Sequence, residues 1–204
     1  MTDRLPATEE GLQRAATILR DGGIVAFPTD TVYGVGCAAA RPEAVAAIFA
    51  LKRRRVDRLI PILVSGLDGV SGDAWEVDQR ARALAEALWP GALTLVLPAR
   101  ESGGSQAFRA PDHRVALALI EGAGPLYVTS ANVSDEPETL DADDVLIAFA
   151  TQADELAAVV DGGRVTGGIA STVLDLTVTP ARIAREGPIS RDALAAIIDL
   201  QPVD

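Results

Sequence analysis

Strand and helix signals follow one another along this chain without a strict alternation, and this irregular order is what most constrains the fold. Because several strands are joined by a loop alone, a mixed sheet is expected rather than a purely parallel one. The sequence therefore predicts an α/β fold with α+β character, in which residues 99–106 are the most loop-like stretch. The apolar runs predict strands at 24–27, 59–64, 93–97, 125–129, 156–160, 171–176 and 181–184. Helical spacing predicts helices at 9–20, 42–51, 77–88, 114–121, 142–150 and 191–200.

The length of 204 residues and a hydrophobic content of 49% are typical of one domain, which we expect to cover residues 1–204. No stretch approaches the ~20 apolar residues that cross a bilayer, and no apolar leader is present, so a cytoplasmic protein without membrane contact is expected. A single cysteine, Cys37, and a single histidine, His113, exclude an intrachain disulfide and argue against a structural zinc site and most nucleophile–histidine machinery. His113 is expected in the first turn of a helix.

The charge is unevenly distributed. The chain carries a formal net charge of −11, whereas residues 52–58 hold five cations and only one anion, Asp57. Non-specific nucleic-acid binders are usually basic, so a general RNA-binding role is disfavoured. A local concentration of positive charge on an acidic body indicates a focused anion pocket.

Three polar segments stand at the ends of apolar runs and are predicted to form one anion site. They are Pro28–Gly34 (PTDTVYG), the cationic run Lys52–Arg55, and Thr129–Ser134 (TSANVS). Neither a Walker A sequence nor a G-x-G-x-x-G fingerprint occurs. A nucleotide would therefore have to be held by Arg and Lys side chains, hydroxyls and the amides of glycine-rich turns.

Each segment also has a plainer interpretation. Lys52 and Arg54 can share a target only if the helix ends near Lys52, and otherwise the run simply complements the negative end of the helix dipole in solvent. Strand alternation would place Ser130 and Asn132 on one face, yet both residue types also form local turns. Arg109 and Arg185 could be ordinary surface arginines.

Together these motifs resemble the YrdC-like family of L-threonylcarbamoyladenylate synthases. The similarity continues through Trp89–Gly91, Phe108–Pro111, Ser171–Val173 and Ala184–Gly187, so it spans nearly the whole chain. It implies a single YrdC-like domain with a twisted mixed sheet and flanking helices. It also implies that L-threonine, bicarbonate and ATP, with Mg²⁺, are condensed to threonylcarbamoyl-AMP and pyrophosphate. The product would serve the threonylcarbamoyladenosine modification of tRNA through a downstream tRNA threonylcarbamoyl transferase complex, with weak tRNA binding possible.

The resemblance also implies a role for individual residues, and it implies no metal held by the protein alone. The catalytic residues are expected to be Lys52, Arg54, Ser130 and Asn132. Threonine is expected to contact Thr31, Arg109, Ser130 and Ser171. ATP is expected to contact Arg54, Arg58, Ser105, Asn132 and Arg185.

The chain departs from the usual family pattern at Arg53, Arg55 and Asp135, and it reads Arg58-Leu59-Ile60 where the family usually reads K/R-P-L. Two other functions stay open at this point. One is a relative that applies the same adenylate chemistry to carbamoyl phosphate, and the other is an RNA-binding or ribosome-associated module.

Overall fold

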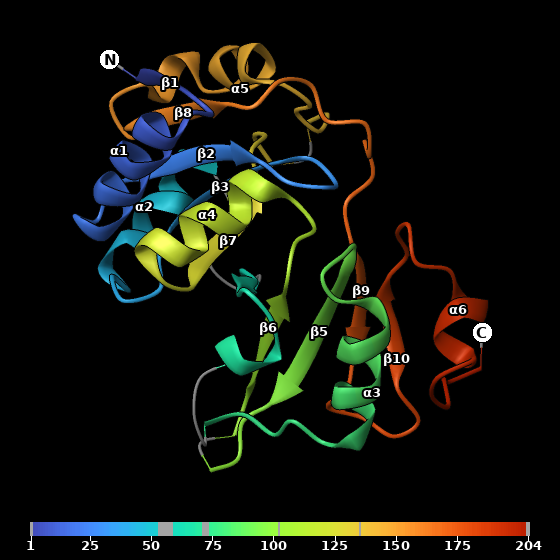
Figure 1. Cartoon of the computed structure of the whole chain (residues 1–204). Coiled ribbons are helices and arrows are strands. Elements are labelled where there is room, and N and C mark those ends of the chain that lie inside the picture. Colours follow the sequence, from blue (N-terminus) through green and yellow to red (C-terminus); the bar gives the residue numbers. More distant parts are fainter. Residues whose placement is uncertain (1, 53–58, 71–73, 102, 135, 203–204) are drawn as a thin grey trace.

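The computed structural model describes residues 2–52, 59–70, 74–101, 103–134 and 136–202 (Figure 1). Ten strands of this described part join one sheet in the order β1-β8-β2-β3-β7-β4-β6-β5-β9-β10. The pairs β1–β8, β2–β8, β4–β6 and β5–β9 are parallel, whereas the other five are antiparallel. The predicted mixed α/β fold is thereby confirmed. The strands are β1 (Asp3–Pro6), β2 (Val25–Pro28), β3 (Tyr33–Ala38), β4 (Ile62–Leu63), β5 (Leu93–Pro98), β6 (Ser105–Arg109), β7 (Leu126–Ser130), β8 (Ala158–Asp161), β9 (Thr172–Asp175) and β10 (Arg182–Arg185).

The first wing of the sheet consists of β1, β8, β2, β3 and β7, and helices cover both of its faces (Figure 1). Strand β2 shows how the sequence produces this, because Val25 and Phe27 belong to one core cluster and Ala26 to the other, as the two-residue period of a strand requires. Helices α1 (Glu9–Arg20) and α4 (Arg114–Ala123) supply the first cluster, and α2 (Glu43–Lys52) and α5 (Ala142–Ala148) the second.

The second wing consists of β4, β6, β5, β9 and β10, and it has its own hydrophobic core. Leu93, Leu95 and Leu97 of β5 alternate onto one face and pack with residues of α3 (Gln79–Leu88) and α6 (Arg191–Ala195). Two short 3-10 helices, η1 (Leu67–Gly69) and η3 (Ala150–Gln152), complete the described elements. Within the described residues, no helix combines the length and apolar character that crossing a membrane requires.

Several element predictions need correction. Strands β1 and β3 were not predicted, and β6 begins inside the stretch that the sequence predicts as a loop. In β3 the two glycines of YGVGCA hide the strand signal, although close packing requires them: a Cβ on Gly36 would lie 2.4 Å from the carbonyl oxygen of Tyr127 on β7. Strand β4 holds only two of the six residues expected there, and helix α6 ends at Ala195 rather than residue 200.

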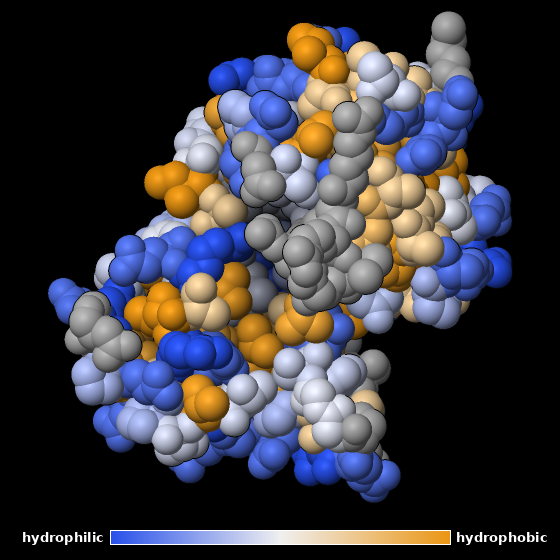
Figure 2. Space-filling view, turned by 180° about the vertical axis from the view of Figure 1, so that it is seen from behind, coloured by the Kyte–Doolittle hydropathy of each residue, from blue (hydrophilic) through white to orange (hydrophobic). Residues whose placement is uncertain are grey.

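The two wings meet at the two-residue strand β4, which pairs with β7 on one side and β6 on the other. So short a strand leaves the flanking strand ends uncovered, and a cavity of about 730 Å³ opens at this junction. Seen from behind, the surface is hollowed between the upper and lower parts of the molecule (Figure 2). The fold therefore places a polar cavity where segments from both wings converge.

Candidate functional site

The cavity gathers side chains that are widely separated in the sequence. Every predicted site residue in the described part of the chain lines it, whereas Arg54 and Arg58 lie outside the described residues. The lining residues among those predicted are Thr31, Lys52, Ser105, Arg109, Ser130, Asn132, Ser171 and Arg185. The predicted convergence of the three polar segments is thus confirmed for the described residues.

Lys52 is the last described residue of α2, and it is buried at 2% exposure; its relation to Arg54 lies outside the described residues. Its ammonium donates to the backbone carbonyl and the hydroxyl of Ser130 and, over 3.1 Å, to Oδ1 of Asn132. Ser130 Oγ in turn donates to the same Asn132 oxygen over 2.7 Å. The interpretation of Lys52 as a solvated helix-end cation is therefore wrong.

Ser130 and Asn132 meet as predicted, but Asn132 lies in a turn after the strand, so the turn interpretation holds for Asn132 and strand alternation does not. Strand β7 ends at Ser130, and the Asn132 amide donates locally to the carbonyl of Glu136 over 2.6 Å. This bond fixes the amide orientation and leaves Oδ1 turned toward Lys52. A local turn therefore positions the polar groups beside the buried cation.

The loop between β2 and β3 is organised by its two threonines. Thr29 Oγ1 donates to the carbonyl of Val32 over 2.7 Å, accepts from the amide of Thr31 over 3.2 Å and lies 3.0 Å from Thr31 Oγ1. Both threonines are buried, at 4% and 2% exposure. The hydroxyl of Thr31 is thereby held at the cavity wall.

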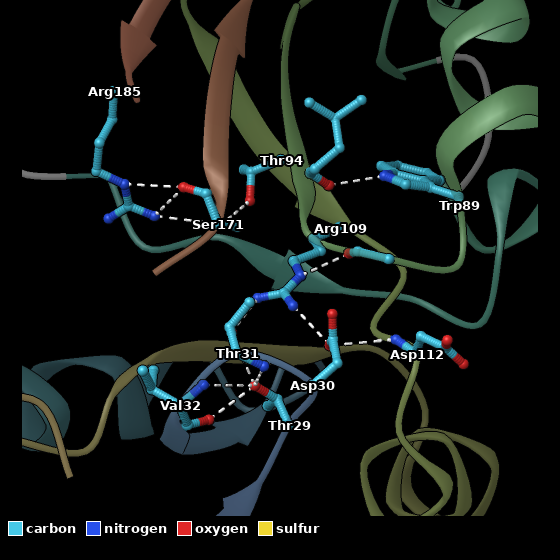
Figure 3. Close-up of polar contacts among 12 residues, drawn as sticks. Thr29, Asp30, Thr31, Val32, Trp89, Thr94, Arg109, Asp112, Ser171 and Arg185 are labelled. Atoms are coloured by element: carbon cyan, nitrogen blue, oxygen red, sulfur yellow. Dashed lines mark hydrogen bonds and ion pairs between the residues drawn. The ribbon is translucent and has the colours of Figure 1, made fainter. Parts of the chain in front are cut away.

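Arg109, at the end of β6, crosses to this loop from the other wing (Figure 3). Its guanidinium donates to the carbonyl of Gly91 over 3.0 Å, to Thr31 Oγ1 over 2.9 Å and to Oδ1 of Asp30 over 2.6 Å. Burial lowers the pKa of Arg109, and the carboxylate of Asp30 opposes that shift. The side chain is only 8% exposed, so Arg109 is a buried, ion-paired arginine rather than a surface one.

Ser171 links β5 with Arg185 of β10 (Figure 3). Its hydroxyl lies 2.8 Å from Thr94 Oγ1, and it accepts from Arg185 Nη2 over 3.2 Å. Arg185 also donates twice to the Ser171 carbonyl, over 3.0 and 2.8 Å. Partial burial lowers the pKa of Arg185, an effect opposed by the charge of Glu138.

A glycine-containing segment after β8 packs against the threonine loop. A Cβ on Gly167 would lie 2.6 Å from the carbonyl oxygens of both Asp30 and Thr31, and Gly168 has a φ of 68° that favours glycine. The amide of Gly168 donates to the Thr31 carbonyl over 2.8 Å.

A second pair of glycines in this segment contacts the start of β3. The phenol of Tyr33 donates to the carbonyl of Gly163 over 2.8 Å and accepts from the amide of Gly162 over 3.2 Å. These glycines therefore support the threonine loop from outside.

Among the groups that escaped the sequence analysis are Asp30, the partner of Arg109, and two residues that line the cavity, Thr94 and Glu138; each left a signal. Asp30 lies inside the PTDT motif, between the two threonines that received attention. Thr94 is a single hydroxyl in the apolar strand LTLVLP. Glu138 is a carboxylate in the segment that follows TSANVS, and it lines the cavity.

The residues usual in covalent catalysis are placed elsewhere. Cys37 is fully buried in β3, where burial raises the pKa of its thiol to about 11. His113 does not lie in the first helical turn, as expected, but directly precedes it as the N-cap of α4, with Nδ1 accepting from the amide of Val115 over 3.3 Å. Cys37 is therefore a core residue, and His113 is a helix cap.

Fold and cavity together define a class: a mixed-sheet α/β protein whose central cavity presents cations, hydroxyls and an amide, groups that suit an anionic ligand. Comparison with known proteins makes this specific. The family model Sua5_yciO_yrdC, described as "Telomere recombination", matches residues 17–187. The chain belongs to this Sua5/YciO/YrdC family.

Similarity to individual relatives supports the same family membership. A relative from Mycobacterium leprae is 36% identical over 94% of this chain and 90% of its own length. The threonylcarbamoyl-AMP synthase of Bacillus subtilis is 34% identical over 100% of this chain and 61% of its own length. The crystal structure of Pyrococcus abyssi Sua5 complexed with L-threonine superposes with a TM-score of 0.88 at 33% identity and covers 99% of this chain and 63% of that one. The Bacillus and Pyrococcus proteins are therefore longer than the region they share with this chain.

Proposed function

We propose that this protein is a threonylcarbamoyl-AMP synthase, which condenses L-threonine, bicarbonate and ATP to threonylcarbamoyl-AMP and pyrophosphate. The observation that carries the proposal is the single cavity in which Lys52, Arg109 and Arg185 converge with the hydroxyls of Thr31 and Ser171. The names of the relatives and the threonine bound by the Pyrococcus protein support it. The reaction would make the chain a nucleotidyltransferase.

The chemistry needs positioning and charge neutralisation rather than an enzyme nucleophile. The threonine amine becomes a carbamate, and a carbamate oxygen attacks the α-phosphorus of ATP in line with the leaving pyrophosphate. Negative charge then develops on phosphate oxygens, where preorganised cations and donors give the largest benefit. Lys52, with Ser130 and Asn132, is proposed to meet that charge.

The two substrates are assigned to different walls of the cavity. Arg109 uses one hydrogen bond each to Gly91, Thr31 and Asp30 out of five N–H donors, so it retains capacity for the threonine carboxylate next to Thr31 and Ser171. Arg185 and Asn132 are assigned to ATP, together with Ser105 at the start of β6. Arg54 and Arg58 keep their proposed ATP roles as predictions outside the described residues.

Mg²⁺ is proposed to arrive bound to ATP, as part of that substrate, and to neutralise phosphate charge. The unstable product would pass to a tRNA threonylcarbamoyl transferase complex in the cytoplasm. We expect tRNA binding to be weak at most, since the chain carries a net charge of −11.

A pyrophosphate-release assay in which each substrate is omitted in turn tests the proposal. Pyrophosphate should form only when threonine, bicarbonate and Mg-ATP are all present, and Lys52→Ala should keep this requirement while turnover falls roughly a hundredfold. Release of orthophosphate would contradict the proposal, and so would equal turnover with carbamoyl phosphate in place of threonine and bicarbonate. The latter result would instead support the carbamoyl-adenylate relative.

A further inference from the structure

Glu138 presents a carboxylate oxygen that the protein leaves without a donor. Among the described residues, Glu138 Oε2 is the one buried side-chain oxygen or nitrogen that has no hydrogen-bond partner. The residue is half-buried and lines the central cavity. A buried carboxylate oxygen without a donor is costly, so the arrangement indicates a group that is satisfied by a ligand.

The backbone around Glu138 is fixed, which makes its position a property of the fold. The carbonyl of the next residue, Thr139, accepts from the amide of Tyr33 over 3.0 Å, and the Thr139 hydroxyl donates to the carbonyl of Ala131 over 3.1 Å. Tyr33 lies only two residues after Thr31 in the threonine loop. Glu138 is therefore held beside the wall to which the amino acid is assigned.

The charges of the cavity show which ligand would suit this carboxylate. Glu138 lies near enough to Arg185 to oppose the fall in that arginine's pKa, yet among the described residues no carboxylate forms an ion pair with Arg185 within 4.0 Å. Arg109 faces the same cavity with donors to spare. A guanidinium and a carboxylate that share a cavity without pairing are complementary to a zwitterion, which brings both charges at once.

We propose that Glu138 binds the ammonium group of the amino-acid substrate, while Arg109 and Ser171 bind its carboxylate. This inference rests on the proposed function, because it assigns a binding residue for the amino acid of that reaction. A ribose hydroxyl is the other common donor to such a carboxylate. Position favours the ammonium group, since the segment of Glu138 is bonded to the threonine loop and the ribose belongs to the ATP.

The test measures binding of two ligands by titration calorimetry to the wild type and to Glu138→Gln, which keeps the shape and removes the charge. The ligands are L-threonine and (R)-3-hydroxybutanoate, which is threonine without its amino group. We expect the wild type to prefer threonine, and Glu138→Gln to weaken threonine binding roughly tenfold to a hundredfold while 3-hydroxybutanoate binding stays within about twofold. Glu121→Gln is the control, because its exposed carboxylate on α4 lies outside the residues that line the cavity and should not affect threonine binding.

Each other outcome counts against the inference in a distinct way. Equal threonine binding by wild type and Glu138→Gln would overturn it and leave the proposed function intact. An increase in the KM for ATP alone would also overturn it, in favour of a ribose contact. Equal affinity of the wild type for 3-hydroxybutanoate and threonine would also overturn it, because the amino group would then contribute nothing to binding. A wild type that binds neither ligand and releases no pyrophosphate would overturn the proposed function as well.

Discussion

Two arginines of the same cavity, Arg109 and Arg185, are held in opposite ways. The guanidinium of Arg109 is buried and paired with the carboxylate of Asp30 at 2.6 Å, on a segment from the other wing. Arg185 is exposed as a residue although its guanidinium is partly desolvated, and among the described residues its hydrogen bonds go to the neutral oxygens of Ser171. The ion pair of Arg109 joins the two wings and orients its guanidinium. Arg185 has no carboxylate partner within 4.0 Å among the described residues, so its positive charge is available to a ligand. Arg109 is therefore expected to contribute to stability as well as to ligand binding, whereas Arg185 is expected to contribute mainly to ligand binding.

The largest expected effect is that of Arg109→Ala on stability. Loss of the guanidinium leaves the Asp30 carboxylate, which is only 17% exposed, without its counter-ion. Breaking such a buried pair from one side typically lowers the free energy of unfolding by about 3–5 kcal/mol, which denaturant titration can measure. Arg4→Ala is the control: it breaks two ion pairs of 2.7 Å around an exposed guanidinium and should cause a much smaller change. Equal losses in both variants would break the comparison.

Arg185→Ala should have the smaller effect on the fold and a clear effect on the reaction. Because Arg185 is exposed and bonded only to neutral oxygens, we expect little change in unfolding free energy. Loss of charge-assisted bonds to ATP should raise the KM for ATP by about tenfold to a hundredfold. Arg14→Ala, which removes an exposed arginine of α1 paired with Asp3 at 2.5 Å and outside the cavity lining, is the control for a general change of charge. A KM for ATP that is unchanged in Arg185→Ala would leave this arginine without its proposed role.

Much of the site could be predicted from the sequence because its groups occur in short local patterns. The placement of Lys52 on α2 follows from helical periodicity, and the contact of Ser130 with Asn132 follows from their separation by one residue at the end of β7. The mixed sheet followed from the order of the apolar runs. These features depend on spacings of a few residues, which a single sequence displays directly.

The missed features depend on contacts between distant segments. Asp30 and Arg109 are 79 positions apart, and no local pattern indicates that they pair. The unpartnered oxygen of Glu138 becomes visible only when all its neighbours are placed. Strand β3 was missed because glycines that close packing with β7 requires also erase the usual strand signal.

One cavity is proposed to join threonine, a one-carbon unit and ATP, and isotope labelling shows whether the one-carbon unit enters the product. The protein is incubated with L-threonine, Mg-ATP and ¹³C-bicarbonate, and the adenylate is analysed by mass spectrometry. The account predicts threonylcarbamoyl-AMP that carries one ¹³C atom in its carbamoyl group, together with pyrophosphate. An adenylate of threonine without the carbamoyl carbon, or a product that takes no label from bicarbonate, would contradict it.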